Sequence, residues 1–318
     1  MEKGVIMAYV KYILKKLIQI VVITFLVSLL VFFSLRLNPT SPLTVIIGNK
    51  QSTPELQQQY TEQFDLDEPL LKQYIIWLKG IAHGDLGIDY VQKQPILNQI
   101  IDRIPITIGL VLFSTILGTV IAILIGVLAA MKRGTFIDYL IVGLSVLLIS
   151  VPHLIFGLLL QKVFAGNLRW FPTIGWPEGK DLWFGGWKYT VLPTLTGCFS
   201  YIATYTRLLK TSMLDVVNQD YVLTAESKGL SKSAIIRKHI LRNSFIPVMT
   251  QLPMSVAMCI TGSFFIESIF SIPGIGQYYV TAVNNQDLSI VLGETVLLSI
   301  LYIAVIFITD ILYVFVDP

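Results

Sequence analysis

Three histidines and two cysteines are the residues of this sequence best suited to metal binding or nucleophilic chemistry. His83, His153 and His239 are far apart, and Cys198 and Cys259 each lie inside an apolar stretch. Zinc sites need ligands at short, regular spacings, and reactive or metal-binding cysteines often occur as a Cys-x-x-Cys pair. Neither pattern is present, so the sequence predicts no metal site, and we interpret both cysteines as small packing residues.

Nucleotide chemistry would require a glycine-rich phosphate-binding loop. Gly175 and Gly179-Lys180 come nearest to one, but the glycines are too close together, and Asp181 stands where a serine or threonine would bind magnesium. Neither a nucleophile elbow nor a His-Glu zinc motif occurs. We therefore expect no catalytic residue and no cofactor bound by this chain.

Three ionisable residues within or beside long apolar segments could instead contact a passing solute. His153 follows Pro152 in the middle of one segment, Glu294 lies in the last one, and Glu267 lies at the end of another. Charges at the centre of a bilayer cost about 2.5–3.5 kcal/mol, so such groups usually face a cavity or a partner. His153, Glu267 and Glu294 are candidates for a translocation path; structural burial of the histidine and simple hydration of the two glutamates are the alternatives.

The segments that must position these residues are membrane spans. Hydrophobic residues make up 54% of the chain and charged residues only 14%, which is outside the usual range of a soluble domain. A helical span needs about 20 apolar residues. Six segments meet this requirement: 17–35, 105–131, 139–161, 189–206, 243–266 and 289–316. The first is longer than the apolar part of a signal peptide and no cleavage site follows, so we interpret it as a retained anchor.

Basic residues indicate the orientation of these spans. They concentrate in residues 3–16, at Lys132 and Arg133, and from Arg207 to Arg242, which predicts that these connections and both termini are cytoplasmic. The net charge of +3 and its dispersal argue against nucleic-acid binding. The predicted fold class is all-α, with residues 1–36 forming a cytoplasmic segment and first span, 37–104 an extracytoplasmic segment, and 105–318 a five-helix core.

The extracytoplasmic segment contains a predicted amphipathic helix. Asp67-Glu68-Pro69 suits a first helical turn, and the apolar residues between Leu70 and Leu78 form a broad face. Gly80 is expected to end the helix. We expect this helix to lie on the outer surface of the membrane.

The cytoplasmic loop 207–243 has helical signals of its own. Residues 221–228 can form two turns with Val222 and Ala225 on one face, and Gly229 can take the left-handed closing conformation. Ser231 can cap a second helix, whose apolar face carries Ile235, Ile236 and Ile240. Two short helices joined at a glycine would make a compact knob through which a partner could move two spans; an ordinary solvated loop is the alternative.

This loop resembles the coupling loop of type I ATP-binding-cassette importer permeases, in particular their oligopeptide branch. The resemblance rests on Tyr221-Val222-x-Thr224-Ala225-x-x-Lys228-Gly229-Leu230, followed by His239-x-Leu241-Arg242-Asn243 and Pro247. The sequence differs from the usual pattern at Leu223, Glu226 and Ser227. The resemblance implies that the short helix docks on a cytosolic ATPase through Tyr221, Thr224, Ala225, Glu226, Lys228, Gly229, Leu230, His239 and Arg242.

Further motifs extend the resemblance over nearly the whole chain. They include Asp67-x-Pro69-Leu70-x-x-Gln73-Tyr74, Gly84-Asp85-Leu86-Gly87, Lys132-Arg133-Gly134, Gly262-Ser263-Phe264-x-Ile266-Glu267 and Ile272-Pro273-Gly274-x-Gly276. Asp317-Pro318 matches the start of the family's last motif. The basic residue that usually follows this pair is absent, so we expect the motif to be cut short.

The resemblance implies a MetI-like permease fold in the bacterial cytoplasmic membrane. The implied partners are a second homologous permease, two cytosolic ATPase subunits that bind ATP and Mg²⁺, an extracytoplasmic substrate-binding protein and membrane lipid. The implied function is import of oligopeptides. Alternatives in the same family are import of nickel or a metallophore, of dipeptides, or of glutathione. A secondary transporter working without ATP is the alternative from another class; it would predict inverted repeats, which are not evident.

Overall fold

The computed structural model describes residues 2–36, 43, 47, 53–63, 65–177 and 186–316. Within these ranges the regular structure is helical, with one isolated bridge between Ile88 and Pro95, which agrees with the predicted all-α class. Gly179-Lys180, Asp181 and Asp317-Pro318 lie outside the described residues, as does the side chain of Cys259. The chain forms two compact units, one of residues up to Pro105 with Gln277–Phe307, the other of Ile106–Gly276 with the segment from Ile308 onward.

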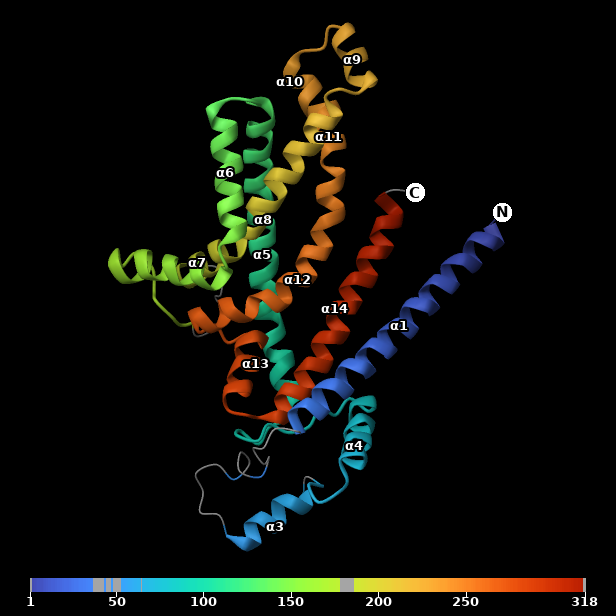
Figure 1. Cartoon of the computed structure of the whole chain (residues 1–318), viewed down its shortest axis with the longest axis vertical. Coiled ribbons are helices and arrows are strands. Elements are labelled where there is room, and N and C mark those ends of the chain that lie inside the picture. The colour runs from blue at the N-terminus through green and yellow to red at the C-terminus, as the bar shows by residue number, and fades with distance from the viewer. Residues whose placement is uncertain are drawn as a thin grey trace. The chain divides into compact units, whose positions relative to one another are not determined.

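The first unit combines the N-terminal helix with the residues between that helix and α5 and with parts of the last two helices. It contains α1 (Glu2–Arg36), α3 (Pro54–Gln63), α4 (Leu70–Ala82), the start of α5 (Ile96–Met131) and most of α13 (Ile275–Asn284) and α14 (Leu288–Val316), all labelled or traceable in Figure 1. Phe32 of α1, Tyr74 of α4 and Leu292 of α14 form one of its buried hydrophobic clusters. Ser28 and Tyr74 share a hydrogen bond of 2.9 Å between their hydroxyl oxygens, which fixes α4 against α1.

Helix α4 begins at Leu70, just after the residues predicted to form its first turn, and ends later than predicted. Pro69 occupies the N-cap, but the helix continues through Gly80 to Ala82, and the left-handed conformation is taken by Gly84 at φ 83°. Gly80 is needed for a different reason, because the carbonyl oxygen of Asp85 lies 3.3 Å from the position a Cβ would occupy. Close backbone approach, not helix termination, therefore explains this glycine.

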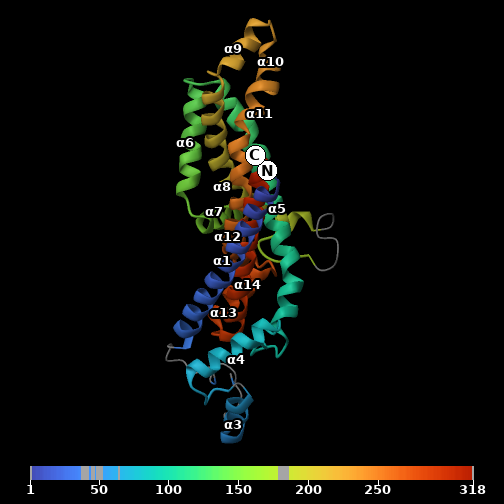
Figure 2. The same cartoon turned by 90° about the vertical axis from the view of Figure 1, so that its right-hand side faces the viewer.

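The second unit is built around α8 (Trp187–Val216), which packs against α6 (Phe136–Ser150), α7 (His153–Leu160) and α12 (Ile246–Phe270). Figure 2 shows α6 and α8 side by side, as their contacts require. Small residues allow close approach: a Cβ on Gly118 or Gly126 of α5 would lie about 3 Å from atoms of α8. Such small-residue contacts are typical of helix packing inside membranes.

The predicted span 139–161 is not one straight helix. It is divided into α6 and α7, which meet at an angle of 104°, and α7 continues into the π-helical segment η1 (Gln161–Asn167). Val151 is extended and Pro152 caps α7, because proline lacks the amide hydrogen that a continuous helix would use and disfavours helical geometry in the residue before it.

Three helices are long and apolar enough to cross a bilayer, by length and composition, among the residues described: Lys11–Arg36, Ile96–Met131 and Leu288–Phe307. The bent pair α6 and α7 with η1 raises this number to four if it counts as one span. The predicted spans 189–206 and 243–266 fall largely within α8 and α12, which have 30 and 25 residues. The chain is a multi-pass helical membrane protein, whereas the count of six spans and the cytoplasmic termini stay predictions.

Candidate functional site

The loop between α8 and α12 folds as the helical knob expected from its sequence. Helix α9 (Asp220–Ser227) buries Val222 and Ala225, at 1% and 4% exposure. Both belong to one apolar cluster with Leu209 and Met213 of α8. The knob is therefore packed against the span that precedes it, and Figure 1 shows α9 and α10 at its tip.

Gly229 and Ser231 make the turn between the two helices. Gly229 has φ 76°, which an L-residue with a side chain rarely adopts, and nothing lies within 4 Å of the position of its missing Cβ. The Ser231 side chain accepts a hydrogen bond from the Ala234 amide at 3.4 Å, at the start of α10 (Lys232–Ile235). Both predicted turn signals are confirmed.

The second helix of the knob changes its geometry along its length. After α10 it becomes the π-helical segment η2 (Ile236–Ile240) and then α11 (Leu241–Ser244). Hydrogen bonds in a π-helix connect residues five apart, which brings Ile235 and Ile240 to one side. Both are buried, and Ile236 packs against the same cluster, as predicted.

The remaining predicted coupling residues are mostly available at the knob's surface. Tyr221, Thr224, Glu226, Lys228, Gly229, Leu230 and Arg242 are exposed and His239 is half-buried, whereas Ala225 faces inward. The Tyr221 hydroxyl accepts a hydrogen bond of 2.8 Å from Asn243 Nδ2, which holds α9 against α11. Exposed Tyr221, Leu223 and Leu230 give the knob apolar area beside the charges of Glu226 and Lys228.

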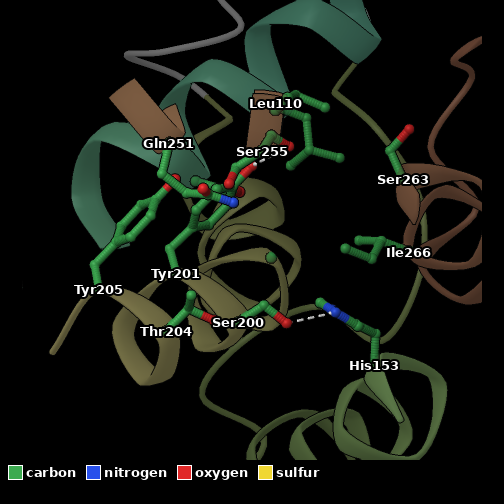
Figure 3. A pocket seen from close by; sticks show the side chains of 13 residues that line it. Leu110, His153, Ser200, Tyr201, Thr204, Tyr205, Gln251, Ser255, Ser263 and Ile266 are labelled. Atoms are coloured by element: carbon green, nitrogen blue, oxygen red, sulfur yellow. Dashed lines mark hydrogen bonds between the residues drawn. The ribbon is translucent and has the colours of Figure 1, made fainter. Parts of the chain in front are cut away.

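A second feature is a cavity of about 310 Å³ in the second unit, between α5, α7, α8 and α12 (Figure 3), which opens to the surface of the chain beside the exposed residues Thr204 and Gln251. Most of its lining area is apolar, with hydroxyl, amide and imidazole groups interspersed. Its lining residues are Leu110, Val111, Ser114, His153, Gly197, Ser200, Tyr201, Thr204, Tyr205, Gln251, Ser255, Ser263 and Ile266. No aspartate, glutamate, lysine or arginine is among them. The cavity is thus polar in places, and the described residues of its lining contribute no fixed charge.

Local hydrogen bonds set the shape of the cavity. His153 Nε2 and Ser200 Oγ lie 2.6 Å apart (Figure 3), which joins the first residue of α7, next to Pro152 in the sequence, to α8. Tyr201 donates a weaker hydrogen bond of 3.4 Å to the Ser255 carbonyl oxygen on α12. The hydroxyl of Ser114 is buried without a hydrogen-bond partner, so it has capacity for a ligand or water.

The three candidate path residues lie in different surroundings. His153 lines the cavity, whereas Glu267 does not. Glu267 is fully buried at the end of α12, where its Oε1 accepts a hydrogen bond of 2.6 Å from Thr107 Oγ1 of α5. Glu294 is fully buried in α14 and belongs to the first unit. A role in the path stays a prediction for all three.

Sequence analysis missed the uncharged residues of the lining. The signal was present as polar pairs four residues apart within apolar helices, Ser200 with Thr204 on α8 and Gln251 with Ser255 on α12. Residues four apart lie on the same face of a helix. A search for charge alone overlooks such pairs.

Two buried carboxyl groups in the first unit were also missed. Asp287, just before α14, accepts a hydrogen bond of 2.8 Å from the Tyr90 amide, and its side chain is hydrogen-bonded to Asp89. Burial raises the pKa of Asp287 to about 6, and the charge of Asp89 acts in the same direction. Burial likewise raises the pKa of Tyr90 to about 12. This pair fixes the turn that precedes α5 to the start of α14.

A multi-pass helical protein with an exposed helical knob and a cavity between its helices, lined by uncharged described residues, has the features of a membrane transport subunit. The chain belongs to the family of binding-protein-dependent transport system inner membrane components, whose model matches residues 122–318. A second family model, for the N-terminal part of such membrane components, matches residues 9–111.

Characterised relatives match nearly the full chain. The dipeptide transport system permease protein DppB of Lactococcus lactis subsp. cremoris is 35% identical over 97% of this chain and 98% of its own length. The oligopeptide transport system permease proteins OppB of Haemophilus influenzae and Escherichia coli K12 are 34% and 33% identical, each over 97% of this chain and 98% of their own length. The chain is therefore a multi-pass permease subunit of an ABC importer in the bacterial plasma membrane and not a catalytic enzyme.

Proposed function

We propose that this chain forms one half of the translocation path of an ATP-driven importer of oligopeptides. The observation that carries the cargo assignment is the uncharged, hydrogen-bonding cavity of the second unit, in a chain similar throughout to dipeptide and oligopeptide permeases. Serine, threonine, tyrosine and glutamine side chains can each both donate and accept hydrogen bonds. A peptide offers one donor and one acceptor at nearly every residue.

The proposed assembly contains four kinds of partner. A second homologous permease completes the path, an extracytoplasmic binding protein delivers the peptide, and two cytosolic ATPase subunits bind ATP and Mg²⁺ and dock on the knob. Lipid surrounds the spans. The rigid packing of the knob against α8 through Val222 and Ala225 supports the coupling role, because force applied at α9 reaches a helix that lines the cavity.

Other cargoes of the same family make different chemical demands. Dipeptides and glutathione present the same backbone groups as longer peptides, so the cavity does not separate them. Nickel is bound by imidazole and related ligands at several positions, and the described lining supplies one imidazole, His153. A metal that enters inside a metallophore is already coordinated, so its transport would need fewer protein ligands than transport of the free ion. ATP-independent transport is disfavoured by membership of a binding-protein-dependent family.

The test is uptake in a strain that lacks only this chain. We expect loss of ATP-dependent uptake of labelled di-, tri- and pentapeptides, with nickel and metallophore uptake unchanged, and recovery when the chain is restored. Loss of metal uptake alone would move the chain to the metal branch. Unchanged uptake of every peptide would refute the proposal.

A further inference from the structure

The polar groups of the cavity are arranged in two ladders on facing helices. Gln251 and Ser255 are four residues apart on α12, and Ser200 and Thr204 are four residues apart on α8. Figure 3 shows side chains from both helices around the same space. Four residues of an α-helix span about 6 Å along the helix axis. In an extended peptide, every second residue points to the same side, and such residues are roughly 6.8 Å apart. The two spacings are therefore close.

We propose that this cavity holds a short, extended segment of the peptide by its backbone and that its lining sets the charge preference of uptake. The inference rests on the proposed function and deepens it. At about 310 Å³ the cavity equals roughly ten water molecules in volume, so it takes a short segment of a peptide and not a whole oligopeptide. The remainder of the peptide lies outside it.

The Ser114 hydroxyl in the lining of the cavity has no hydrogen-bond partner among the described residues. Ser114 is 3% exposed, lines the cavity, and has no hydrogen-bond partner for its Oγ. A Cβ at Gly197 would lie 2.6 Å from this oxygen, so the glycine leaves the hydroxyl room. A buried polar group without a partner is unfavourable, and a passing amide would satisfy it.

The lining is expected to distinguish charged from neutral peptide side chains, because its described residues carry no charge that could pair with an incoming one. A charged side chain that enters loses part of its hydration at the buried end around Ser114 and Ser263, and it meets no opposite charge among the described lining residues. The nearby carboxylate of Glu267 is outside the lining and is engaged by Thr107. Peptides whose held segment carries only neutral side chains therefore pass more readily than those with lysine or glutamate there.

The experiment changes the charge of the lining with almost no change in shape. Gln251→Glu is introduced into the complete importer in cells, and uptake of Ala-Ala-Ala, Ala-Lys-Ala and Ala-Glu-Ala is compared. We expect the ratio of Ala-Lys-Ala to Ala-Ala-Ala uptake to rise by about tenfold, equivalent to about 1.4 kcal/mol, and the Ala-Glu-Ala ratio to fall. Because the binding protein is unchanged, its own preference cancels from the comparison of variants.

Gln59→Glu is the matched control, since Gln59 is an exposed residue of α3, outside the predicted spans, and does not line the cavity. It should leave the ratios unchanged at an equal membrane level. If Gln251→Glu fails to reach the membrane, Thr204→Asp on α8 tests the same cavity. Unchanged ratios in an inserted, active variant would overturn the inference, whereas peptide uptake that persists without the chain would overturn the proposed function instead.

Discussion

Thr107 and Glu267 are 160 residues apart in the sequence, yet Thr107 Oγ1 donates a hydrogen bond of 2.6 Å to Glu267 Oε1. The same hydroxyl oxygen accepts the Ile275 amide at 3.0 Å, at the start of α13. Gly274 fits against both side chains only because it lacks a Cβ. One threonine thus joins α5 to both sides of the turn that follows α12.

Thr107→Val is predicted to destabilise the second unit, because it removes a donor from a buried carboxyl group. Leaving a buried hydrogen-bonding group without its partner costs about 1–3 kcal/mol, so the unfolding temperature in detergent should fall by several degrees, measured by tryptophan fluorescence. Thr107→Ser, which keeps the hydroxyl, should recover most of the loss. Equal stability of the valine and wild-type proteins would contradict the assigned role.

Replacing Gly229 is predicted to uncouple ATP hydrolysis from uptake. The cause is backbone strain at its positive φ and not a steric clash, because no atom lies within 4 Å of the position of its missing Cβ. Gly229→Val should impair coupling strongly, and Gly229→Asn mildly, because asparagine tolerates the left-handed conformation. The measurement is the number of ATP molecules hydrolysed per peptide imported by the complete transporter in liposomes.

Gly134 provides the control for this prediction. It has the same φ of 76° and equally empty surroundings, but it lies in the turn between α5 and α6, outside the knob. Gly134→Val should strain the chain to a similar extent while leaving the ratio of hydrolysis to transport unchanged. Normal coupling in the inserted Gly229→Val transporter would exclude the proposed role of the knob.

Glu226 is predicted to face basic residues on the docked ATPase. It is exposed on α9, close to the apolar residues Leu223 and Leu230, and a charge at the rim of an interface chiefly affects association and its dependence on salt. Glu226→Lys should therefore weaken ATPase association, most strongly at low ionic strength. Co-purification at several salt concentrations measures this, and Glu226→Gln should give an intermediate effect.

The local features of the knob could be predicted from sequence because each depends on neighbouring residues. The spacing of Val222 and Ala225 defines a helix face, and a glycine followed by a serine two residues later marks an end and a new start. Gly80 shows the limit of such signals: its role depends on the carbonyl of Asp85, whose approach no local pattern specifies.

Long-range pairs could not be predicted in the same way. Nothing near Asp89 indicates that it will meet Asp287, and nothing near Thr107 indicates Glu267, because each pair forms only when distant helices have packed. The bend at Pro152 was foreseeable from proline chemistry, but its size of 104° depends on α8, which holds His153 through Ser200.

The Asp89 and Asp287 pair predicts a pH dependence of stability. Burial raises the pKa of Asp287 from 3.8 to about 6, so between these pH values the folded chain keeps a proton that the unfolded chain has lost. The folded state then binds more protons, and stability decreases as pH rises through this window. The contribution is complete below about pH 4 and lost above about pH 6, on the order of 1.4 kcal/mol for each unit of pKa shift.

Asp287→Asn isolates this effect, because asparagine stays uncharged at every pH and can donate to Asp89. The stability of the variant minus that of the wild type should increase between pH 4 and pH 6 and then remain constant, measured by thermal unfolding in detergent. Asp102→Asn, at an exposed position of α5, controls for the change in net charge. If the Asp287→Asn and wild-type curves run parallel across this range, the two carboxyl groups do not share a proton, and the Tyr90 amide is the hydrogen-bond donor that explains the position of the Asp287 side chain.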